Sequence, residues 1–131
     1  MNISGLLGTS LNGGTNSDVL THLVLLKPLP HLPASERQAF INAFERALRE
    51  IPAIRAVRIG SRIVHGAGYE LAAADVADYM AAIDFDDLAG LRAYLSHPAH
   101  AELGRLFGEV LSSSMVYDFE IGGIEKLRVG D

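Results

Sequence analysis

The stretch VLTHLVLLK at residues 19–27 is apolar on both of its alternating faces. One face carries Leu20, His22, Val24 and Leu26, and the other carries Val19, Leu23 and Leu25. A strand with this pattern is covered on both sides, and Pro28 ends it. The sheet that contains this strand therefore needs a protein layer over each of its two faces.

The rest of the chain adds helices and strands in the order β-α-β-β-α-β. A helix is predicted at residues 35–51, where apolar residues recur every three or four positions and Ser35 with Gln38 matches a capping box. Its charged residues, Arg37 and Glu45 among them, fall largely on the solvent side. Strands are predicted at residues 55–63, 78–85 and 112–120, and a second helical region is broken at Pro98. This order indicates an α+β, ferredoxin-like fold: a four-stranded antiparallel sheet with helices on one face.

Helices on one face leave the other face of the sheet without a cover. In the first strand that face carries Val19, Leu23 and Leu25, which are too apolar for water. A second sheet from an identical subunit is the simplest cover, and two-fold dimers are the commonest oligomers. The sequence therefore predicts a homodimer.

Composition and charge exclude several classes of protein and favour a single globular domain. The 131 residues fit one domain, with 49% hydrophobic and 21% charged residues. The net charge of −5 argues against nucleic acid or an anionic membrane as the main partner. The absence of cysteine excludes a disulfide framework and a thiolate metal site. No apolar run approaches the roughly 20 residues of a membrane span, and no basic residue precedes Lys27. We expect a cytoplasmic protein without a membrane partner.

A more specific motif, Y-x-x-H-P-x-H, occupies residues 94–100 between the two parts of the second helical region. Together with THLV at residues 21–24 and YDF at residues 117–119, it resembles the dimeric stress-responsive α/β-barrel (Dabb) family. The resemblance covers residues 19–120 and implies a dimer whose two sheets form a barrel-like core. Residues 1–18 are then an N-terminal arm, and residues 121–131 are a C-terminal extension.

Within this family the nearest functional parallel is the plant polyketide cyclase that forms olivetolic acid. The resemblance implies that His100 and Tyr94 are catalytic and that His22 is a third site residue. It also implies a substrate pocket between sheet and helices, formed by Val24, Leu26, Phe40, Ile41, Phe44, Val57, Tyr79, Ala81 and His97. Phe44, Tyr79 and Leu111 replace a tyrosine, a histidine and a tryptophan of the cyclase, which changes the shape and polarity of the pocket.

The same residues allow two interpretations. Pro98 at the first helical position puts His97 at the cap and His100 at the third position, where the helix dipole favours a neutral imidazole. His100 can then accept a proton next to a carbonyl while Tyr94 stabilises the enolate and His22 orients, as in a lyase or cyclase without a cofactor. Alternatively, these are core and capping residues of a non-catalytic structural or ligand-carrying dimer. No set of three or four converging metal ligands is apparent, so no metal site is predicted.

Overall fold

The computed structural model describes residues 19–128, so the arm predicted at residues 1–18 and the last three residues lie outside it. The elements are, in chain order, β1 Leu20–Pro28, α1 Ala34–Glu50, β2 Ile54–Ser61, the 3-10 helix η3 Gly68–Leu71, β3 Tyr79–Phe85, α2 Leu88–Ser96, α3 Pro98–Val110, β4 Leu111–Glu120 and the 3-10 helix η4 Ile124–Leu127. This order confirms the predicted α+β, ferredoxin-like architecture.

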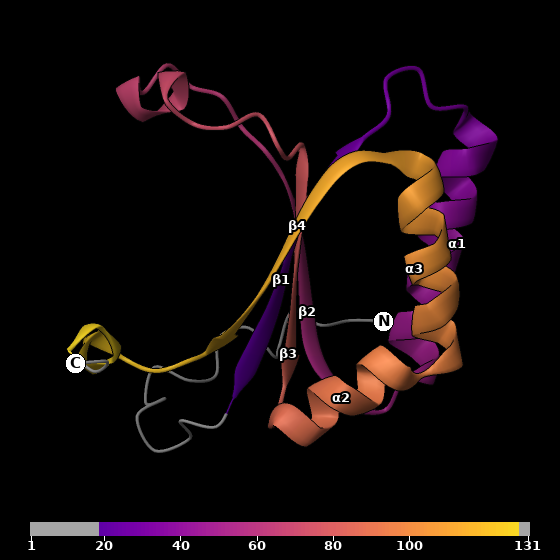
Figure 1. Cartoon of the computed structure of the whole chain (residues 1–131), viewed down its shortest axis with the longest axis vertical. Coiled ribbons are helices and arrows are strands. Elements are labelled where there is room, and N and C mark those ends of the chain that lie inside the picture. The colour runs from indigo at the N-terminus through magenta and orange to yellow at the C-terminus, as the bar shows by residue number, and fades with distance from the viewer. Residues whose placement is uncertain (1–18, 129–131) are drawn as a thin grey trace.

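The four strands form one antiparallel sheet in the order β2-β3-β1-β4. β1 lies between β3 and β4, with His22 opposite Ile83 on one side and opposite Asp118 on the other. The helices α1, α2 and α3 all lie against one face of this sheet (Figure 1). The strand alternation therefore separates a helix-covered face from an open face.

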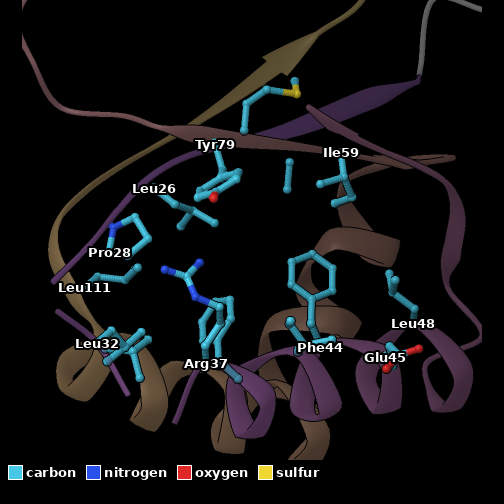
Figure 2. Close-up of a pocket in the computed structure, with 15 residues that line it drawn as sticks. Leu26, Pro28, Leu32, Arg37, Phe44, Glu45, Leu48, Ile59, Tyr79 and Leu111 are labelled. Carbon is cyan, nitrogen blue, oxygen red and sulfur yellow. The ribbon is translucent and has the colours of Figure 1, made fainter. Parts of the chain in front are cut away.

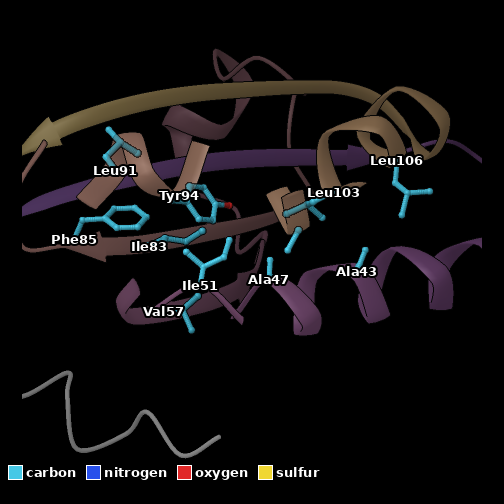
Figure 3. Close-up of a cluster of buried hydrophobic side chains, with 11 residues drawn as sticks. Ala43, Ala47, Ile51, Val57, Ile83, Phe85, Leu91, Tyr94, Leu103 and Leu106 are labelled. Carbon is cyan, nitrogen blue, oxygen red and sulfur yellow. The ribbon is translucent and has the colours of Figure 1, made fainter. Parts of the chain in front are cut away.

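The main core fills the space between the helices and the sheet (Figure 3). Phe85 and Ile83 of β3 are its largest fully buried side chains. They pack with residues of all three helices, of the neighbouring strand and of the position that follows α1: Ala43, Ala47, Ile51, Val57, Leu91, Tyr94, Leu103 and Leu106. The small Ala47, only 1% exposed, lets α1 approach the sheet closely.

Side chains cap the starts of α2 and α3, and of these two caps the one by His97 was predicted. The Asp87 side chain caps α2 by accepting from the backbone N–H of Gly90, and His97 Nδ1 caps α3 by accepting from the N–H of Ala99. The capping box predicted at Ser35 and Gln38 is wrong. α1 begins one residue earlier, after Pro33, which has no side-chain acceptor. The Pro33 carbonyl accepts from the N–H groups of Glu36 and Arg37, so Ser35 lies inside the helix and not at its cap.

The open face of the sheet carries a row of large apolar side chains on β1 and β4. The register places them side by side, and we call this set the open-face patch: Leu23, Leu25, Met115, Tyr117 and Phe119. Tyr117 is 47% exposed and Phe119 is 48% exposed, so about half of each of these two residues is open to solvent in a single subunit. The η3 and η4 segments both extend beyond the sheet on this same side (Figure 1).

Candidate functional site

A pocket of about 400 Å³ lies between α1 and the helix-covered face of the sheet (Figure 2). Of the substrate-binding residues predicted from sequence, six line it: Leu26, Phe40, Ile41, Phe44, Tyr79 and Ala81. Val24 and Val57 are instead buried in the adjoining core, and His97 caps α3. Most of the lining is apolar, as a site for a small organic molecule requires.

Local sequence explains where the pocket forms. On α1, residues at helical spacing point toward the sheet, from Arg37 near its start to Leu48 near its end. On the sheet, the floor contains Ala81, whose small side chain lies between Val24 of β1 and Ile59 of β2. An alanine at this central position leaves room that a larger side chain would fill.

Two charged residues contribute to the lining, Arg37 and Glu45. Both were predicted to lie largely on the solvent side of α1, and both are exposed in the structure, although their side chains also border the pocket. The long side chains of Arg and Glu can reach across an apolar face while their backbone lies at its margin. In Figure 2 the Arg37 side chain extends from α1 into the space below Leu26 and Tyr79. The pocket thus combines apolar walls with one cationic and one anionic group.

The three residues predicted to be catalytic form a second cluster, on α2, α3 and β1. The Tyr94 ring contacts His22 with a centroid distance of 5.6 Å and His100 with a centroid distance of 4.7 Å, both edge to face. His22 Nδ1 lies 2.6 Å from Asp118 Oδ1 on β4. A carboxylate only accepts hydrogen bonds, so His22 donates its Nδ1–H to Asp118, and its Nε2 takes no part in this hydrogen bond. We call Asp118, His22, Tyr94 and His100 the ring cluster.

Burial sets the protonation of two of these groups. Removal from water raises the pKa of Tyr94 to about 12, so its phenol stays protonated near neutral pH and has an O–H to donate. Burial also lowers the pKa of His100, and the nearby His22 lowers it further, while a backbone hydrogen bond at Leu95 acts in the opposite direction. His100 is therefore a neutral imidazole near pH 7. The pair has the protonation states that a proton acceptor and a hydrogen-bond donor need.

The ring cluster and the pocket are separate in this structure. None of His22, Tyr94 and His100 lines the pocket. Tyr94 is 2% exposed and His22 is 5% exposed. His22 precedes the pocket residue Leu26 by four positions on β1, roughly 13 Å along a strand. A pocket ligand would therefore reach the ring cluster only by extending along β1 into the core.

Sequence reasoning did not assign a role to Asp118, Arg37 or Ile59. Asp118 stands in the YDF segment, but its contact with His22 joins positions 96 residues apart and follows from strand register.

Within residues 19–128, no group of three or more His, Asp or Glu side chains is placed to hold a metal ion. None of the described helices is long and apolar enough to cross a membrane.

Comparison with known proteins agrees with this architecture. The family model of the stress responsive A/B barrel domain (Dabb) matches residues 20–121. A dimeric protein of unknown function with a ferredoxin-like fold from Bacteroides fragilis has 24% identity and a TM-score of 0.56, over 79% of this chain and 96% of that one.

Two solved structures with named activities also share the fold. Hydroxynitrile lyase from Passiflora edulis has 14% identity and a TM-score of 0.68, over 81% of this chain and 95% of that one. SnoaB, a cofactor-independent oxygenase from Streptomyces nogalater, has 12% identity and a TM-score of 0.58, over 81% and 95%. The sequence has no significant match among curated proteins.

Proposed function

The chain belongs to the stress responsive A/B barrel domain (Dabb) family, and we propose that it acts as a homodimer that binds a small, mostly apolar carbonyl compound between α1 and the sheet. The pocket is the observation that carries this proposal. Its volume of about 400 Å³ falls within the range of small-molecule sites, and its apolar walls favour an apolar body.

The dimer part of the proposal is supported by the open-face patch. Large exposed apolar patches on a folded domain mark surfaces that bind other proteins. Pairing two open faces would give each sheet a cover on both sides, as the two apolar faces of β1 require. The structurally similar Bacteroides fragilis protein is described as dimeric, which favours the same arrangement here.

Catalysis is a second candidate function, and the ring cluster favours it. His100 would remove a proton next to the carbonyl, and the Tyr94 phenol would donate to the oxygen that becomes the enolate. His22, held by Asp118, would orient the Tyr94 ring. The protein would then be a lyase or cyclase without a cofactor. The burial of Tyr94 favours the binding role in the conformation described.

Binding can be tested with methyl hexyl ketone, a neutral carbonyl compound with an apolar chain, by isothermal titration calorimetry. Ala81→Leu places a larger side chain on the pocket floor and should abolish heat of binding while circular dichroism stays unchanged. Because Ala81 is only 1% exposed, Ile41→Ala provides a second variant at a half-exposed lining position, and it should weaken binding. Val116→Ala, a truncation outside the lining, is the control. Equal affinity in all four proteins would contradict the pocket assignment.

Catalysis can be tested without knowing the substrate. If the ring cluster abstracts protons next to a carbonyl, the protein should accelerate deuterium exchange in heavy water at the methylene group next to the carbonyl of methyl hexyl ketone. NMR measures this exchange. His100→Gln should remove the acceleration, and Tyr94→Phe should reduce it. Exchange no faster than in buffer would leave the ligand-carrying role as the function of the fold.

A further inference from the structure

We propose that the pocket binds its ligand as a carboxylate, with the anionic head at Arg37 and the apolar chain running along α1 toward Leu48. This inference rests on the proposed binding function and adds the chemical class and the orientation of the ligand. Nothing in the family match or in the predicted site residues assigns a role to Arg37.

The pocket has a direction that follows from the helix. Arg37, Ile41, Phe44 and Leu48 line it from α1 at intervals of four, three and four residues. At a rise of 1.5 Å per residue, the eleven positions from Arg37 to Leu48 span about 16 Å. The lining is therefore an elongated stripe with its cation at the start of α1.

The sheet gives the two ends different chemistry. Tyr79 pairs with Leu26 near the end of β1, from which the chain leads directly into α1 and Arg37. Ile59 pairs with Ala81, one strand repeat further along. In Figure 2 Arg37 and Tyr79 lie toward the same half of the pocket, and Ile59 and Leu48 lie in the other half. One end thus offers a guanidinium and a phenol, and the other offers aliphatic surface.

The charged side chains of the pocket also favour a carboxylate head group at Arg37. Arg37 forms no ion pair with any residue between 19 and 128, whereas Arg46 is paired with Glu50 on the same helix. An unpaired guanidinium presents a fixed fork of donors that matches a carboxylate. Glu45 lies two turns further along α1 and lines the pocket too, so it would repel an anionic head placed toward that end. Both charges favour the same orientation of a carboxylate ligand.

The experiment compares octanoate with octanol, which share a chain and differ in the charge of the head group, by calorimetry at neutral pH. Arg37→Met should weaken octanoate binding about fivefold, as for a partly exposed charge pair, and leave octanol binding unchanged. Arg37→Lys should retain part of the octanoate affinity. Arg49→Met, at an exposed arginine of α1 outside the lining, should change neither. Added salt should weaken octanoate binding only.

The outcomes separate the two proposals. If octanol binds but octanoate does not, or if Arg37→Met leaves octanoate affinity unchanged, the carboxylate assignment fails while the pocket remains a binding site. If Arg37→Met weakens both probes equally, the arginine acts through packing and the assignment also fails. If neither probe binds the wild-type protein, the proposed binding function fails as well.

Discussion

Replacing Phe119 by alanine should convert the proposed dimer into a monomer at micromolar concentration. Phe119 lies on β4 opposite Thr21, on the open face of the sheet, and 48% of its surface is exposed in one subunit. If two open faces pair, this exposed half becomes buried against the second sheet. Truncation removes that burial without touching the helix-covered core.

The size of the effect follows from the exposed area. An aromatic side chain has about 200 Å² of surface, so the exposed half of Phe119 amounts to about 100 Å². At 25 cal/mol per Å², its burial contributes about 2.5 kcal/mol per subunit. Two-fold symmetry places two copies in one interface, and alanine keeps part of the area, so the loss is about 4 kcal/mol per dimer. That corresponds to a dissociation constant roughly 1,000-fold larger.

Sedimentation velocity over a range of concentrations measures this change. The wild-type protein should sediment as a dimer and Phe119→Ala as a monomer of 14.1 kDa. The control is Val116→Ala on the same strand, since Val116 is 46% exposed but faces the helix-covered side. A wild-type protein that is monomeric at high micromolar concentration, or equal dimerisation of the two variants, would refute the assignment of the interface to the open face.

Three further predictions concern the ring cluster. The free energy of unfolding of the wild-type protein should fall by about 2–3 kcal/mol as pH rises from 10 to 12, because tyrosine in the unfolded chain loses its proton near pH 10 while folded Tyr94 keeps its proton to about 12. In urea titrations, Tyr94→Phe should lack this loss of stability. Because burial lowers the pKa of His100, the unfolded state binds a proton at this residue more readily than the folded state, and the free energy of unfolding should decrease as pH falls below 6.5. NMR titration of the His100 ring should show a midpoint under 6.5. Asp118→Asn should lower the free energy of unfolding, measured with urea, by about 1 kcal/mol, because the half-exposed Asp118 makes a charge-assisted hydrogen bond with buried His22. An unchanged free energy of unfolding would mean that this pair contributes no net stability.

The fold could be predicted from sequence because its main signals are local. Alternation along residues 19–27 identified both apolar faces of β1, and the three-to-four-residue repeat identified α1. Pro98 separated α2 from α3 because proline is favoured at the first position of a helix and not inside one. The family resemblance predicted His22, Tyr94 and His100 as site residues, and in the structure the Tyr94 ring contacts both histidine rings.

Other features could not be predicted because they depend on packing between distant segments. The partner of His22 is fixed by the register of β1 with β4, which no local pattern encodes. The lining role of Arg37 depends on the conformation of a long, exposed side chain, whereas its position on the helix fixes only the direction of its Cα–Cβ bond. At the start of α1, serine is a common cap, but the preceding Pro33 carbonyl already accepts the N–H groups of Glu36 and Arg37.

The central place of β1 in the sheet has a consequence for how the protein folds. β1 is synthesised before the other strands, yet one neighbour, β3, ends at residue 85 and the other, β4, ends at residue 120. Until both have left the ribosome, a stretch that is apolar on both faces keeps unpaired backbone groups on one or both edges. Pairing across such sequence distances is slow, so the nascent chain passes through an interval in which β1 can pair with the wrong strand or with another chain.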